Sequence, residues 1–184
     1  MATNLVARWR DWSGDGLEHL ELREGADAIV AESVVIATVE REAFAVQYRI
    51  ECDLEWRVRK FEIQKIGERA LRLASGGAGN WFDESGVSLP NLAGAIDIDI
   101  SITPFTNTLP IRRLSFAAGQ SHEIVAVYLQ LPGLTVTTDR QRYTCIQPGK
   151  LFKYESIDSD FTRDVEVDDR GLVVNYPGLF RRLL

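Results

Sequence analysis

Residues 96–114 read IDIDISITPFTNTLPIRRL, and this stretch decides how the rest of the chain is interpreted. Side chains on a strand point alternately to its two faces, so Ile96–Thr103 places four isoleucines on one face and two aspartates and two hydroxyls on the other. Same-face neighbours lie roughly 6.6 Å apart, so ionised Asp97 and Asp99 repel by about 2.5 kcal/mol at an effective dielectric constant of 20. The segment predicts a strand and turn with one apolar and one acidic face, and the acidic face either lies in solvent on the outside of a sheet or is turned toward a ligand.

The residues after Ile102 predict one short helix. Thr103 followed by Pro104 fits an N-cap and a first helical position, whereas Pro110 would lie in the interior of any helix that continues to Leu114. We therefore expect a kinked or two-part helical turn. The intervening residues, Asn107 among them, carry short side chains that form local hydrogen bonds.

The clearest alternation outside this segment runs from Phe44 to Leu54, where aromatic and aliphatic side chains alternate with polar and charged ones. This pattern indicates a long, half-buried strand. The apolar phase changes in the next segment, between Trp56 and Phe61, and a β-bulge near Arg59–Lys60 would absorb the change.

Further strand-like segments follow at spacings near ten residues, with turn formers between many of them. The Asp168–Gly171 segment joins two of them as a hairpin would. We predict strands at Glu18–Arg23, Ser33–Val39, Arg69–Ala74, Ile96–Ile102, Glu123–Leu131, Leu134–Thr138, Arg140–Ile146, Leu151–Ile157, Phe161–Val167 and Leu172–Tyr176. The chain is therefore mostly β, a large antiparallel meander that must curl to bury its apolar face.

Length and charge restrict the function classes. The 184 residues fit one domain, 1–184, without a linker-like segment. A net charge of −6 opposes nucleic-acid binding. No apolar run is long enough for a membrane span, and no export signal is evident, so we expect a cytoplasmic protein that is not integral to a membrane.

Cysteine and histidine are too scarce for most cofactor and metal chemistry. Cys52 and Cys145 are expected as buried reduced thiols, and two histidines do not form a zinc-binding pattern. No GxSxG nucleophile elbow or phosphate-binding loop is present. We expect no metal, no cofactor and no catalytic residue.

Three segments carry a resemblance to a known family: DIDISITPFTNTLPIRRL, then RQRYTC at 140–145, and VDDRGLVVNYPGLFRR at 167–182. They resemble the signature segments of the family described as "Putative glycolipid-binding", formerly catalogued as a domain of unknown function. The resemblance implies a broad, open, barrel-like antiparallel sheet wrapped around a single short helix, remotely like lipoprotein-localisation factors. It also implies a homodimer and an acidic pocket for a sugar head group.

Candidate ligand contacts combine this resemblance with the chemistry of the side chains. Carboxylates accept hydrogen bonds from sugar hydroxyls, arginine can contact a sugar or phosphate, and aromatic rings stack on sugars. Arginine can equally balance the charge of the aspartates. The candidates are Asp97, Asp99, Asn107, Arg112, Arg113, Arg140, Arg142, Tyr143, Asp53 and Glu18.

Three functions remain open from the sequence. The first is non-enzymatic binding of an amphipathic molecule, a glycolipid by the resemblance, with Asp97 and Asp99 at its polar head. The second is a carbohydrate or glycolipid hydrolase that uses one of these aspartates with a partner from another strand, such as Asp53 or Glu18. The third is a dimeric interaction protein that binds no small ligand.

Overall fold

The computed structural model describes residues 3–184, which form one sheet of fourteen strands. The strands are β1 (Thr3–Asp11), β2 (Leu17–Glu24), β3 (Ile29–Val39), β4 (Glu42–Cys52), β5 (Val58–Lys65), β6 (Leu71–Ser75), β7 (Trp81–Asp83), β8 (Asp97–Ile100), β9 (Ser121–Gln130), β10 (Thr135–Gln147), β11 (Leu151–Ser156), β12 (Thr162–Val167), β13 (Val173–Tyr176) and β14 (Phe180–Arg182). Their order in the sheet is β7-β6-β5-β4-β3-β2-β1-β14-β13-β12-β11-β10-β9-β8. The predicted single-domain span of 1–184 stays a prediction.

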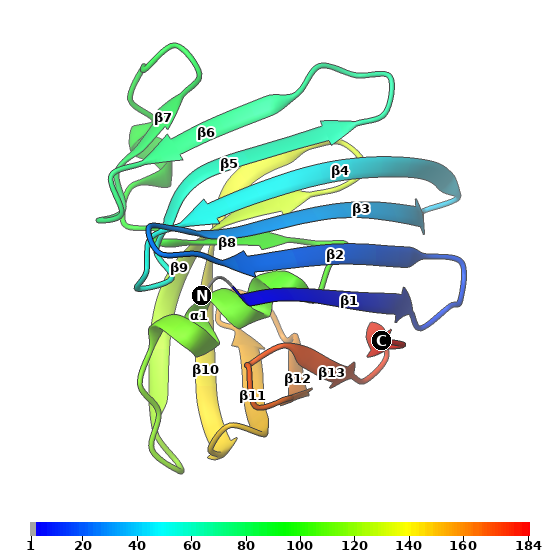
Figure 1. The fold of residues 1–184 in the computed structure, drawn as a ribbon, viewed down its shortest axis with the longest axis vertical. Helices are drawn as coiled ribbons and strands as arrows, with labels where there is room; N and C mark the ends of the chain where they lie inside the picture. The colour runs from blue at the N-terminus through cyan, green and yellow to red at the C-terminus, as the bar shows by residue number, and fades with distance from the viewer. Residues whose placement is uncertain (1–2) are drawn as a thin grey trace.

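The sheet is open and strongly curved, as the sequence predicted. Figure 1 shows β1–β6 as one stack of ribbons, with β9 and β10 running steeply across it and α1 in the space between them. Neighbouring strands are antiparallel except β8 and β9, which pair in parallel with Asp99 opposite Tyr128. The predicted large curved antiparallel sheet is therefore confirmed, with one parallel pair at this edge. The sheet is mixed because the chain returns through the helix and a loop before it forms β9.

Local patterns predicted the β4–β5 pair closely. The even-numbered side chains of β4 from Phe44 to Cys52 are buried. The register shifts where Glu51 pairs with Lys60 and Cys52 pairs with Val58, so Arg59 is the extra residue of a bulge, as predicted.

Other strand boundaries needed correction. The predicted strands Leu134–Thr138 and Arg140–Ile146 form one continuous strand, β10, because β9 pairs along its whole first part. The predicted strand Ile96–Ile102 is shorter, since β8 ends at Ile100. The strands β1, β7 and β14 were missed.

The predicted two-part helix is present. A 3-10 turn, η2 (Phe105–Asn107), leads into α1 (Thr108–Arg113), and the Thr103 hydroxyl accepts a hydrogen bond from the Phe105 amide at 3.0 Å. The division places Pro110 in the first turn of α1, where its missing N–H group costs no hydrogen bond. A second 3-10 turn, η1 (Pro90–Leu92), precedes β8.

The helical segment is buried on all sides, from Ile102 through Ile111. Phe105 and Leu109 belong to a core formed mainly with β1–β6 and β8–β9. Ile111 belongs to a second core formed with β10–β13. The helix therefore joins two apolar clusters that the curved sheet keeps apart.

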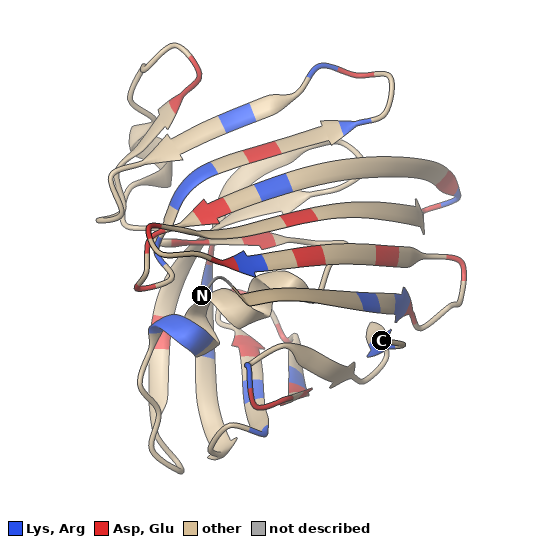
Figure 2. Ribbon diagram, viewed as in Figure 1, with Lys and Arg blue, Asp and Glu red and all other residues tan. Residues whose placement is uncertain are grey.

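Charged side chains are frequent on the strands of the first half of the sheet, where Figure 2 shows both signs on β2–β5. Arg49, for example, pairs with Glu32 across neighbouring strands at 2.7 Å. Both cysteines are free and buried, as predicted. Within residues 3–184, no helix has the length and apolar character that crossing a bilayer requires.

Candidate ligand-binding site

Two adjoining cavities lie near the end of β8. The first, which we name the polar pocket, has a volume of about 360 Å³. It is lined by Asp99, Ile100, Ser101, Thr103, Asn107, Tyr128, Asp139, Tyr154, Ser156, Ser159, Phe161, Tyr176, Leu179 and Phe180. The second, the apolar pocket, has a volume of about 260 Å³. It is lined by Trp9, Asp11, Trp12, Ser13, Gly16, Leu17, Glu18, Val35, Ile36, Ala37, Thr38, Val39, Ser101, Ile102, Gly178, Leu179 and Phe180.

Two carboxylates of the polar pocket share one neutral donor. The Gln141 amide nitrogen donates to Asp99 Oδ2 at 2.7 Å and to Asp139 Oδ2 at 3.0 Å. The Thr106 hydroxyl donates to Asp99 Oδ1 at 3.0 Å, and the Ser156 hydroxyl donates to Asp139 Oδ1 at 3.2 Å. Both N–H groups of this amide are thereby used, and the pair is held by neutral groups alone.

This arrangement leaves electrostatic repulsion between Asp99 and Asp139. Because both accept from one nitrogen, the bonded oxygens lie within about 6 Å of each other, and two charges at that distance repel by roughly 3 kcal/mol at an effective dielectric constant of 20. Burial, together with the charge of Asp139, raises the pKa of Asp99 to about 6, although the hydrogen bonds from Gln141 and Thr106 oppose the rise. Asp99 is thus easily protonated for an aspartate.

Aromatic side chains form part of the wall of the polar pocket. Tyr154 packs edge-on against Phe161 and Tyr176, with ring centroids 5.9 and 6.3 Å apart, and Tyr176 contacts Phe180 in the same way. Tyr154 is 6% exposed and Tyr176 is 4% exposed. Within the described chain, neither hydroxyl has a hydrogen-bond partner, so both remain available to a bound molecule.

Glu18 is the second residue of β2 and contacts Thr103, which lies shortly after β8. Its carboxylate accepts hydrogen bonds from the hydroxyls of Ser33 at 2.8 Å, Tyr48 at 2.6 Å and Thr103 at 2.6 Å. Burial raises the pKa of Glu18 to about 7, because the three hydroxyls only partly offset the loss of solvent. Glu18 lines the apolar pocket, but its bonds tie β2, β3 and β4 to the residue that begins the helical segment.

Asp97 and Asp99 share a strand face, yet their surroundings differ. Asp97 is 1% exposed and forms a two-point contact with Arg113, at 3.1 Å from Nε and 2.5 Å from Nη2. Burial raises the pKa of Asp97, and the guanidinium opposes the rise. Arg113 therefore balances Asp97, one of the two roles considered for the arginines. Asp97 does not line either pocket, and its contact with a ligand stays a prediction.

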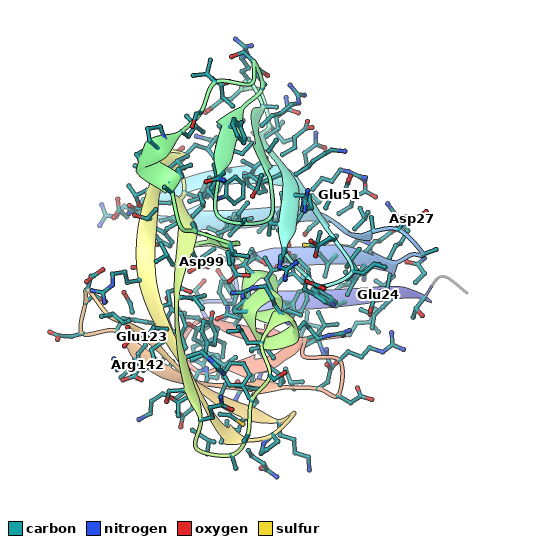
Figure 3. All side chains as sticks on the ribbon, turned by 90° about the vertical axis from the view of Figure 1, so that its left-hand side faces the viewer. Glu24, Asp27, Glu51, Asp99, Glu123 and Arg142 are labelled. Carbon is teal, nitrogen blue, oxygen red and sulfur yellow. The ribbon has the colours of Figure 1, made fainter. Side chains whose placement is uncertain are left out.

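The candidates Arg112, Arg140 and Arg142 also lie outside both pockets. Arg112 stacks on Trp56 at 4.4 Å and donates to the Arg170 carbonyl at 2.9 Å, so it anchors the helix. Arg140 and Arg142 pair with Glu123, and Figure 3 shows Arg142 and Glu123 away from Asp99, which lies in the interior.

Asp53 closes a turn in the β4–β5 connection by accepting bonds from the Glu55 and Arg57 amides, each at 3.0 Å. Asn107, in contrast, lines the polar pocket. The buried Tyr143 hydroxyl donates to Asn107 Oδ1 at 3.1 Å and so orients this amide. Of the predicted site residues, Glu18, Asp99 and Asn107 line the cavities. Tyr143 does not line them but is bonded to Asn107.

Sequence reasoning missed Asp139 and Gln141, which complete the polar site. A signal was present, because on β10 they share the phase of Tyr143 and Cys145, whose side chains are buried. Arg140 and Arg142 have the opposite phase and therefore face away. Tyr154 and Tyr176 were not among the candidates either. They are buried, but they also line the pocket.

Comparisons with known proteins agree with this architecture. The family model described as "Putative glycolipid-binding" matches residues 6–182. The fold is similar to the crystal structure of a DUF1089 family protein from Pseudomonas aeruginosa, with a TM-score of 0.82, 40% sequence identity and 92% of each chain covered. No curated protein matches the chain. Since the model spans nearly the whole sequence, the chain belongs to the Putative glycolipid-binding family.

Proposed function

We propose that this protein binds an amphipathic, sugar-bearing molecule without transforming it. The polar head would occupy the polar pocket, and the apolar part would extend into the apolar pocket. One observation carries the proposal: a cavity that contains two aspartates adjoins a mainly apolar cavity, and the two share Ser101, Leu179 and Phe180. The family description, which names glycolipids, supports the same ligand class.

The polar pocket offers the groups that sugars require. Asp99 and Asp139 can accept hydrogen bonds from hydroxyls, and the tyrosine hydroxyls can donate or accept. The rings of Tyr176 and Phe180 can stack on the apolar face of a pyranose. A cavity of about 360 Å³ falls within the range of small-ligand sites. Of the predicted aspartates, Asp99 is the one to which we assign the head group.

The apolar pocket suits a hydrocarbon chain. Leu17, Val35, Ile36 and Val39 line it from β2 and β3, and Ile102 lines it from the other side. Each buried methylene group of a ligand contributes about 0.8 kcal/mol to binding, so a few carbons are enough to favour an alkylated sugar over the free sugar.

Native mass spectrometry, with solvent extraction of the purified protein and added alkyl glycosides, tests the proposal. We expect a glycolipid adduct that Asp99→Asn weakens at least tenfold. Asp27→Asn is the matched control, because Asp27 is exposed and lies at the periphery in Figure 3. The absence of any captured or added amphiphile would refute the proposal.

The apolar half has its own test. Leu17 is 43% exposed and lines the apolar pocket, so Leu17→Glu should reduce the affinity for a long-chain alkyl glycoside while leaving the fold intact. Ile66→Glu is the control, since Ile66 is 64% exposed and lies at neither pocket. Equal affinities in the two variants would contradict the assignment of the alkyl chain.

A hydrolase is the second candidate, and the raised pKa of Asp99 beside Asp139 favours it. In such a hydrolase the second carboxylate, from another strand, would be that of Asp139 and not that of Asp53 or Glu18. In glycosidases the two carboxylates flank the scissile bond, whereas here both accept from one amide nitrogen and face the same cavity, so we prefer binding. Turnover of glycosides that is lost in both Asp99→Asn and Asp139→Asn would establish the hydrolase instead.

We also propose a homodimer, which the family resemblance implies, and a cytoplasmic location, which the sequence predicts. Sedimentation equilibrium and cell fractionation check them. Should the protein dimerise and bind no amphiphile, the third function, an interaction protein without a small ligand, would take precedence.

A further inference from the structure

We infer that the head group bound in the polar pocket carries a protonated amine next to Asp99 and Asp139. This inference rests on the proposed function, because it concerns the same pocket and narrows the class of head group. It goes beyond a neutral sugar, for which hydrogen bonding alone would be sufficient.

The first argument is the charge of the pocket. Among the described residues that line it, two are aspartates and none is lysine, arginine or histidine. The donors to these aspartates are the neutral groups of Gln141, Thr106 and Ser156. A sugar hydroxyl would complete their hydrogen bonds but would leave two negative charges uncompensated.

The carboxylates inside this protein are stabilised in two ways: Glu18 accepts hydrogen bonds from three hydroxyls, whereas Asp97 and the half-buried Asp168 are each paired with an arginine. Asp97 contacts Arg113 at 2.5 Å, and Asp168 contacts Arg182 at 2.6 Å. Arg140, which follows Asp139 in sequence, instead faces outward to Asp158 and Glu123. Within residues 3–184, no salt bridge joins Asp99 or Asp139 to a cation, and unlike Glu18 these two carboxylates lie close to each other.

The second argument is independent of the carboxylates. The hydroxyls of Tyr154 and Tyr176 line the pocket without a hydrogen-bond partner in the described chain, although each residue is more than nine-tenths buried. The hydroxyl oxygens themselves are open to the cavity, since Thr108 Oγ1 is the one fully buried side-chain oxygen or nitrogen without a partner in the described chain, so a ligand that displaces solvent from the cavity must offer them polar atoms. Their oxygens can accept from an ammonium group, and aromatic faces attract cations.

The same features favour an organic cation over a metal ion. Within the described chain, no group of three or more histidine, cysteine, aspartate or glutamate side chains is arranged to hold a metal. Two carboxylates with an aromatic wall match an alkylammonium or amino-sugar nitrogen, which needs few oxygen ligands and tolerates contact with rings.

Isothermal titration with four amphiphiles of equal chain length tests the inference: an alkyl glucoside, the corresponding 2-amino-2-deoxyglucoside, its N-acetyl derivative and an alkylammonium salt. We expect the amino sugar to bind at least tenfold more tightly than the glucoside and the N-acetyl derivative. Asp99→Asn and Asp139→Asn should each remove most of this preference, whereas Asp27→Asn should retain it.

The outcomes separate the two proposals. Equal binding of the glucoside and the amino sugar would overturn the amine inference and leave the proposed function standing. No binding of any amphiphile would overturn both. Binding of the alkylammonium salt as tight as that of the amino sugar would support the amine and overturn the sugar component of the proposed function.

Discussion

Replacing Glu18 with glutamine should change how the stability of this protein depends on pH. Glu18 is 2% exposed and accepts hydrogen bonds from three hydroxyls, and no ion pair joins it to a cation within the described chain. Burial raises its pKa from the ordinary value of 4.5 to about 7. The folded state therefore holds the Glu18 proton more tightly than the unfolded state.

The sign and size of the effect follow from linkage. A carboxyl group with a raised pKa in the folded state favours folding fully below pH 4.5, and this contribution is lost as the pH rises to about 7. The shift corresponds to about 3 kcal/mol, most of which is lost between pH 5 and pH 8. Glutamine does not titrate, so Glu18→Gln removes this loss.

Urea denaturation of both proteins at several values between pH 5 and pH 8 measures the effect. The free energy of unfolding of Glu18→Gln minus that of the unmodified protein should become more positive by about 2 to 3 kcal/mol across this range. Taking the difference cancels other titrating groups, Asp99 included. Asp27→Asn should show no such trend, since Asp27 is exposed. A difference for Glu18→Gln that stays constant with pH would refute the reasoning.

Three further predictions concern the scaffold. Arg113→Leu leaves Asp97 buried without its cation and should cost about 3–5 kcal/mol in urea denaturation, and Arg113→Leu combined with Asp97→Leu should recover most of it; a cost below about 1 kcal/mol would contradict the pairing. Gly171→Ala should lower the melting temperature more than Gly67→Ala, because both glycines have positive φ but only at Gly171 would a Cβ crowd neighbouring side chains, the nearest at 3.1 Å; equal shifts would contradict this. Both cysteines should react with a thiol reagent only after unfolding, and rapid labelling of the native protein would disagree with their burial.

Patterns within single segments predicted much of the fold. Alternation from Phe44 onward located β4, and the change of phase located the bulge at Arg59, because both depend only on the period of a strand. Thr103 and Pro110 predicted where the helical segment begins and why it divides. The boundaries of β10 and the short strand β14 were missed, since their pairing with neighbours extends or creates them.

The candidate site was predicted only in part. Asp99 was identified from its own strand, but its partner Gln141 comes from 42 positions further along the chain. On β10 the resemblance drew attention to Arg140 and Arg142, although the buried phase of Tyr143 would have selected Asp139 and Gln141. Alternation defines the two faces of a strand. The residues of a site can be chosen from the pattern only when it is known which face points inward.

By itself, the sequence determined that the chain is mostly β, that one short divided helix follows Ile102 and that an acidic strand face precedes it. Only the tertiary structure decided that Asp97 pairs with an arginine, Arg113. It also decided that Asp99 accepts a hydrogen bond from the neutral Gln141 amide and lines a cavity. It also brought Glu18 to Thr103, across 85 positions. The reason is physical: a period of two is a local property, whereas burial, charge pairing and cavities arise from the curvature of a sheet that brings distant strands together.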